Sequence, residues 1–152
     1  MALERTTVLA AVCLLAQLAM PAPSLAQSTH APILVLHSGE DSVGRLFAFE
    51  LREAIRASQG MRLVEQGSAP HIRVSLVSLD TSVGSSRGHA SAIAISMAFD
   101  APDMPMAGAL MSTEVVSCGS NRVVECARQL LASLDAAIST LKNKWPSYAK
   151  RL

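Results

Sequence analysis

The stretch that decides the fold spans residues 33–80 and reads ILVLHSGEDSVGRLFAFELREAIRASQGMRLVEQGSAPHIRVSLVSLD. It opens with an unbroken apolar run at residues 33–36, the pattern of a strand covered on both faces. A helical segment at residues 41–58 follows, and strand-like runs at residues 61–66 and 71–80 complete the stretch. A strand that feeds an amphipathic helix and then returns to further strands predicts an α+β fold.

Downstream, residues 89–99 show the most regular alternation, with large residues on one side and mainly alanine and serine on the other. The large side predicts core, whereas the small side is either open to water or pressed closely by another element. Residues 109–118 form a weaker strand, expected toward a sheet edge. Residues 121–145 keep a 3,4 apolar spacing and predict the longest helix. The order β-α-β-β-β-β-α therefore predicts a two-layer sandwich with a mixed sheet and two helices.

Residues 71–80 contain a change of phase. Apolar residues alternate at Ile72, Val74 and Leu76, and then continue at Val77 and Leu79. A one-residue shift of this kind predicts a β-bulge near Leu76 and Val77.

The helix at residues 41–58 has two contrasting sides when its residues are placed 100° apart. One broad side should face the sheet and carries Val43, Leu46, Phe47, Leu51, Ala54, Ala57 and Ser58. The other side gathers Arg45, Phe49, Arg52 and Arg56. These four are either a solvated face or a partner-binding surface, because aromatic and arginine side chains are enriched in interface hot spots.

Glu50 falls inside the apolar arc of the same helix. Its side chain either extends past its neighbours to water or a local arginine, or forms a half-buried carboxylate. In the second case it would be paired across the core, with Arg62, Arg73 or a histidine. The sequence leaves both interpretations open.

Residues 1–26 have the pattern of a secretory signal peptide. Arg5 precedes an apolar run at residues 8–20, and Ser24 and Ala26 supply a small-x-small cleavage site. The apolar run is too short for a membrane span, which takes roughly 20 residues.

Cys13 raises the alternative of a lipoprotein, but Val12 stands before it where such signals usually carry a small residue. We therefore expect residues 27–152 to form a single exported domain, periplasmic or secreted, with no stable membrane anchor after cleavage.

The overall charge excludes one class of partner. The chain has 13 basic and 12 acidic residues, for a net charge of +1. This balance gives no field that would draw nucleic acid or an anionic membrane. One Trp, one Tyr and three Phe also provide no platform on which bases could stack. Nucleic-acid binding is therefore not expected.

Cys118 and Cys126 are the only cysteines that remain after the predicted cleavage. One ends a strand and the other lies in the first turns of the next helix, in a chain expected to enter an oxidising compartment. This placement predicts a disulfide. The alternative is a pair of buried free thiols.

Residue types that a hydrolase needs are present, namely His37, His71, His89, Ser38, Asp41, Asp80 and Asp103. They occur in neither a G-x-S-x-G nor an H-E-x-x-H motif. We therefore predict a non-catalytic protein without a cofactor, with a small hydrolase as an alternative.

Metal handling is a second alternative. Met104 and Met106, with Met97, Met111 and His89 possibly nearby, offer the soft ligands that suit Cu(I). Methionines on strands are also expected simply to fill the core.

The segments at residues 50–58, 61–65 and 71–76 together resemble the start of the TolB amino-terminal domain and similar envelope-assembly domains. The resemblance is one of arrangement and hydrophobic rhythm over residues 33–80. It implies a periplasmic binding module without catalysis. Because no catalytic or cofactor motif is present, we expect the chain to bind another envelope protein. The binding surface would be the arginine and phenylalanine face of the helix, or the strand edge at residues 111–116.

Overall fold

The structure, a computed structural model, describes residues 30–65, 70–82, 84, 88–101 and 108–150. The predicted signal peptide lies outside these residues. The elements are β1 (Ala31–Ser38), α2 (Ser42–Ala57), β2 (Met61–Leu63), β3 (His71–Asp80), β4 (Ala90–Asp100), β5 (Ala109–Gly119), a 3-10 turn (Ser120–Arg122), α3 (Val123–Lys144) and α4 (Pro146–Ala149). Apart from the two short helical turns, this is the predicted order.

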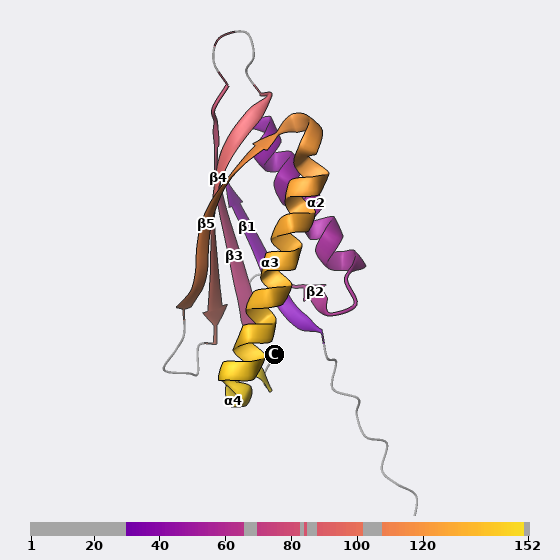
Figure 1. Ribbon diagram of the computed structural model, residues 1–152, viewed down its shortest axis with the longest axis vertical. Helices are drawn as coiled ribbons and strands as arrows, with labels where there is room; N and C mark the ends of the chain where they lie inside the picture. The colour runs from indigo at the N-terminus through magenta and orange to yellow at the C-terminus, as the bar shows by residue number, and fades with distance from the viewer. Residues whose placement is uncertain (1–29, 66–69, 83, 85–87, 102–107, 151–152) are drawn as a thin grey trace, which may run out of the picture.

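The strands form one mixed sheet in the order β2-β1-β3-β4-β5. β1 is parallel to both β2 and β3, whereas β3, β4 and β5 pair antiparallel. Figure 1 shows α2 and α3 side by side on one face of the sheet. The predicted α+β class, with its mixed sheet and two main helices, is confirmed.

The core lies between the sheet and these helices. α2 contributes Phe47 and Leu51, and α3 contributes Leu134, all of them fully buried. The large residues of β4 point to the same side, because Ile93, Ile95, Met97 and Phe99 are buried. None of the helices in the described part of the chain has the length and apolar character that crossing a bilayer requires.

The buried stripe of α2 is rotated from the expected one. Gly44, Ala48 and Ile55 are buried, whereas Leu46 is exposed. The buried arc is about as wide as the expected one but is turned by roughly 60° toward Gly44 and Ala48, because α2 packs against α3 as well as against the sheet. Leu46 lies beyond the edge of the turned arc and is exposed.

The bulge predicted near Leu76 and Val77 is wrong. β3 pairs with β4 without a break from His71 to Asp80, and the irregularity lies instead between Met97 and Ala98 on the β4–β5 side. Alternation therefore continues, so that Ser78 faces the helices. Val77 and Leu79 face the opposite side of the sheet.

The predicted disulfide is confirmed between Cys118, near the end of β5, and Cys126 in α3, with Cα atoms 6.4 Å apart. It holds the start of α3 against the last strand. Closing this short loop should stabilise the fold by about 2–3 kcal/mol by the chain-entropy argument.

Candidate functional site

The predicted partner face lies on the solvent side of α2. The side chains of Phe49 and Leu46 are 54% and 43% exposed. They are three positions apart and so lie on neighbouring turns of one face, with the exposed Arg45 beside them. We call this strip the α2 ridge and define it as Arg45, Leu46, Phe49, Arg52 and Arg56.

Two arginines of the α2 ridge already have partners inside the chain. Arg52 Nη2 donates to the backbone oxygen of Val35 at 3.0 Å. β2 pairs with β1 only as far as Ile33, so the Val35 oxygen has no strand beside it and the guanidinium satisfies it. Arg56 pairs with the carboxylate of Glu53 on the surface. Arg45 is the cation of the ridge most available to a partner.

Glu50 is half-buried beside the ridge. Within the described residues no ion pair reaches it. Arg73 pairs instead with Asp100, with 3.3 Å between Nη1 and Oδ2, and Arg62 is exposed on β2. The structure therefore shows no core pairing of Glu50 with either arginine.

Asp41 organises a polar cluster at the start of α2. As the N-cap residue it accepts a hydrogen bond from Gly44 N–H at 2.6 Å. It also accepts hydrogen bonds from the hydroxyls of Ser78 on β3 and Ser91 on β4, both buried. Burial by itself raises the pKa of Asp41, but these hydrogen bonds outweigh it and hold the pKa below its ordinary value.

His37 completes the cluster, with Nε2 2.8 Å from Ser78 Oγ. Ser78 gives its proton to Asp41, so His37 Nε2 must be the donor toward Ser78. That direction is opposite to a nucleophile–base pair, in which the serine donates to the imidazole. Partial burial lowers the pKa of His37, Asp41 opposes this effect, and Arg52 and Arg45 reinforce it.

The other residues considered for catalysis are dispersed. Asp80 accepts hydrogen bonds from Ser82 N–H and Gly88 N–H, at 2.8 and 2.9 Å, and these bonds lower its pKa. His89 is exposed beside this turn, at the opposite end of β4 from His71. Ser38 is exposed at the end of β1, and Asp103 lies outside the described residues.

His71, the first residue of β3, is buried, and its Nε2 lies 3.7 Å from Asp100 Oδ2. Neither of its ring nitrogens has a hydrogen-bond partner in the structure. It shares the Asp100 carboxylate with Arg73, so these three residues lie together where β3 begins.

The proposed copper ligands do not come together in the described part of the chain. Met97 is fully buried in the core and Met111 packs against it. Met104 and Met106 lie outside the described residues. Among the described residues, no group of three or more histidine, cysteine, aspartate or glutamate side chains is placed to hold a metal ion.

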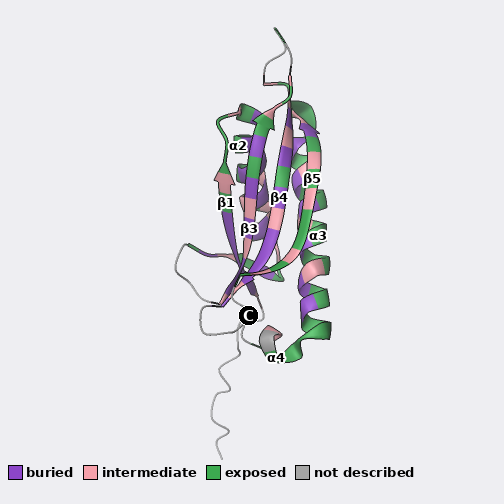
Figure 2. Cartoon of the chain, turned by 90° about the vertical axis from the view of Figure 1, so that its left-hand side faces the viewer, coloured by how far each residue is buried: buried purple, intermediate pink, exposed green. Residues whose placement is uncertain are grey.

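The sheet face opposite the helices carries large exposed aliphatic residues. Val77, Leu79 and Val115 are 57%, 70% and 74% exposed. Figure 2 looks onto this face, with the strands in front of both helices. The small residues of β4 lie between β3 and β5 and leave a shallow furrow of about 470 Å³, lined among others by Ser75, Val77, Ala94, Ser96, Thr113 and Val115.

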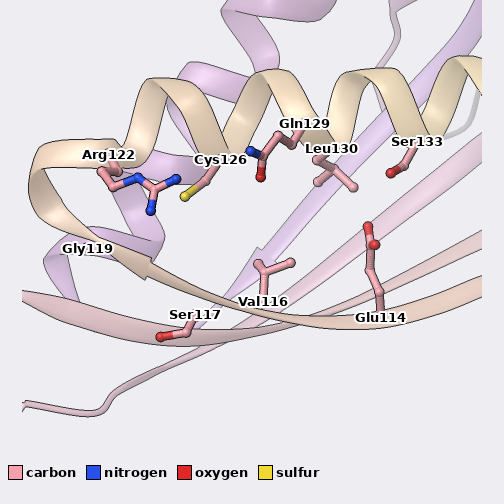
Figure 3. A pocket seen from close by; sticks show the side chains of 9 residues that line it. All are labelled: Glu114, Val116, Ser117, Gly119, Arg122, Cys126, Gln129, Leu130 and Ser133. Carbon is pink, nitrogen blue, oxygen red and sulfur yellow. The ribbon is translucent and has the colours of Figure 1, made fainter.

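A smaller crevice of about 240 Å³ separates β5 from α3. Figure 3 shows Arg122 and Glu114 toward opposite ends of it, with Val116 and Leu130 between them. Glu114 extends from the edge strand toward the helix. The crevice can accept a small polar group, but its two charged residues do not converge on one point.

Sequence reasoning missed two features. Ser78 and Ser91 carry no motif, and only the fold brings them to Asp41. The exposure of Val77 and Leu79 on the open sheet face was also not anticipated. The available signal was a strand with large residues on both of its sides, which is what an exposed apolar face produces.

No protein-family model and no curated protein matches the chain. Among solved structures, the chain is similar to the PelC dodecamer from Paraburkholderia phytofirmans, with 12% identity and a TM-score of 0.45 over 78% of this chain and 92% of that one. A substituted form of the same dodecamer aligns with 14% identity and a TM-score of 0.43 over the same shares. Similarity at this level assigns no family.

Proposed function

We propose that this chain is a non-catalytic accessory domain, exported to the periplasm, that binds another envelope protein through the α2 ridge. The observation that carries the proposal is the exposure of Phe49 on a helix whose opposite stripe already covers the sheet. The Phe49 ring is not part of the hydrophobic core. Burying it against a partner would remove a large apolar surface from water.

The neighbours of Phe49 support the same role. Leu46 enlarges the apolar strip, and Arg45 can pair with a carboxylate of the partner. Aromatic and arginine side chains that become desolvated together are typical of interface hot spots. The chemistry of the α2 ridge therefore fits a partner surface that is apolar with an acidic rim.

The absence of catalysis is part of the proposal. Ser78 is buried and donates its proton to Asp41, and His37 stands on the donor side of that chain of hydrogen bonds. This arrangement favours a structural clamp at the start of α2, because the acceptor of the Ser78 hydroxyl is a carboxylate already engaged by Gly44 N–H and the Ser91 hydroxyl, and the Ser78 oxygen is buried.

The experiment places a photoreactive amino acid at position 49 of the exported protein, crosslinks it in living cells and identifies the captured protein. Affinity for that protein is then measured with Phe49→Ala. We expect binding to weaken by about tenfold or more, as for a truncated hot-spot aromatic, while the melting temperature changes little.

Val124→Ala is the matched control, because Val124 is also half-exposed but lies on α3. It should bind as wild type does. If Phe49→Ala unfolds the protein, Phe49 belongs to the core. If the variant folds and binds at wild-type affinity, the α2 ridge is not the binding surface.

A further inference from the structure

We propose that the open sheet face is an interface with a second copy of this chain, so that two sheets pack face to face around a two-fold axis. This inference goes beyond the proposed function, because it uses the face of the sheet that the helices do not cover. The α2 ridge stays free in such a dimer. Pairs of sheets that pack in this way are a common architecture, with about 10 Å between the sheets.

On the open sheet face, a raised row of large side chains lies beside a furrow. Val77 of β3 is opposite Ala94 of β4, which is opposite Val115 of β5. In the next row, Leu79 is opposite Ala92. Large side chains on β3 therefore form the raised row, and the alanines of β4 form the furrow next to it.

A two-fold axis that runs parallel to the strands, between β3 and β4, makes this shape self-complementary. Rotation about this axis places β3 of each copy opposite β4 of the other, and positions along the strands stay the same. Val77 then enters the furrow at Ala94 of the other copy, and Leu79 enters it at Ala92. Each contact occurs twice, as an isologous interface requires.

The charges of the face permit this packing. The rows that contain Val77 and Leu79 carry no ionisable side chain. Arg73 lies nearer the start of β3, where it already forms an ion pair with Asp100 at 3.3 Å. A charged partner surface would lose its hydration here without gaining a counter-charge. A second apolar face of the same kind has no charged groups whose hydration would be lost.

The size of the face is adequate. β1, β3, β4 and β5 are 8, 10, 11 and 11 residues long. At about 4.8 Å between strands and about 3.3 Å per residue, they cover roughly 600 Å² in projection. The accessible surface follows each side chain and is larger, so it approaches the approximately 800 Å² per partner of a standard interface.

The free edge of β5 is a less suitable place for a second copy. Glu114 extends from that strand toward the helix layer, and charged residues that point inward at an edge oppose strand addition. Pairing β5 with its own copy would also bring two Glu114 side chains near each other. The face, which lacks this repulsion, is favoured over the edge.

The test is sedimentation equilibrium of the purified exported protein over a range of concentrations. We expect a reversible dimer, which Val77→Asp weakens by about 30-fold or more because a charge would be buried without a partner. Val124→Asp makes the same change on α3 and should leave the dimer intact. Circular dichroism checks that both variants fold.

The pairing is tested by a double-mutant cycle. Ala94→Leu should weaken the dimer by filling the furrow, and adding Val77→Ala to the same chain should restore part of the affinity, because the smaller residue at position 77 then faces the larger one at position 94. A wild-type protein that stays monomeric at high concentration overturns the inference, as does a Val77→Asp variant that dimerises normally. Phe49→Ala should not change self-association. A result that overturns the dimer therefore leaves the proposed partner binding by the α2 ridge untouched, and the reverse also holds.

Discussion

A single carboxylate, that of Asp41, connects α2 to two strands of the sheet. It caps the helix through Gly44 N–H and receives the hydroxyls of Ser78 and Ser91. Those serines lie on β3 and β4, so one side chain fixes where the helix begins relative to both. Satisfying three donors in a partly buried place requires the charged form of the carboxylate.

This dependence predicts a loss of stability in acid. The pKa of Asp41 is lowered in the folded protein, so its contribution is complete above the ordinary value of 3.8 and is lost as pH falls through the lower folded value. At neutral pH we expect Asp41→Asn to reduce the free energy of unfolding by about 1–2 kcal/mol. The difference from wild type should shrink in strong acid.

Urea unfolding of both proteins across the acid range measures this difference. Glu40→Gln removes the neighbouring exposed carboxylate and should change the free energy of unfolding by less than about 0.5 kcal/mol. A constant gap between Asp41→Asn and wild type at every pH would show that the charge of Asp41 has no role.

The start of α2 packs against β3 so closely that the helix needs a residue without a side chain there. A Cβ atom built on Gly44 would overlap the side chain of Ser78, and one built on Gly39 would also meet Ser78. Gly39 has a φ of 136°, which independently favours glycine. The contact between this helix and this strand therefore depends on two glycines around one serine.

We predict that Gly44→Ala destabilises the protein, although alanine is favoured over glycine in a helix by about 1 kcal/mol. The added methyl group must displace Ser78 and disturb its hydrogen bond to Asp41, which should lower the melting temperature by several degrees. Thermal unfolding followed by circular dichroism measures the change.

Gly60→Ala is the control for that measurement, because nothing lies within 4 Å of a Cβ atom at Gly60. Its melting temperature should stay close to that of wild type. A Gly44→Ala variant that is more stable than wild type would mean that β3 can move away from α2 without cost.

Across the whole molecule, the two faces of the sheet have different surroundings. One face is covered by α2 and α3 (Figures 1 and 2). The other carries the β4 furrow between exposed aliphatic residues. The α2 ridge lies on the outside of the helix layer, so the two surfaces proposed for binding are on opposite sides of the molecule. This division allows self-association and partner binding to occur together.

Export is a prediction for the whole chain. We expect the protein recovered from the periplasm to begin at Gln27, because cleavage should follow Ala26. Intact-mass measurement identifies the first residue. Ala26→Leu removes the small residue that the cleavage site requires and should cause the uncleaved chain to accumulate. A periplasmic protein that keeps the leader, or a chain found only in the cytoplasm, contradicts this assignment.

The sequence by itself determined what depends on neighbouring residues. The apolar period of residues 41–58 predicted α2, and the alternation of β4 predicted its buried side. The spacing of Cys118 and Cys126 across a strand and a helix predicted their disulfide. Each of these features is decided within a few helical turns or one strand, where period and capping chemistry act directly.

Only the tertiary structure decided which apolar residues stay exposed. The sequence suggested a bulge at Val77 and did not show which face Val77 and Leu79 occupy. The unbroken pairing of β3 with β4 turns both residues to the face without helices, and Leu46 turns outward because α2 packs against α3 as well as against the sheet. The meeting of Asp41 with Ser78 and Ser91 likewise joins residues 37 and 50 positions apart. Local patterns carry no information about which face another element covers, so contacts and exposure at this distance follow from topology alone.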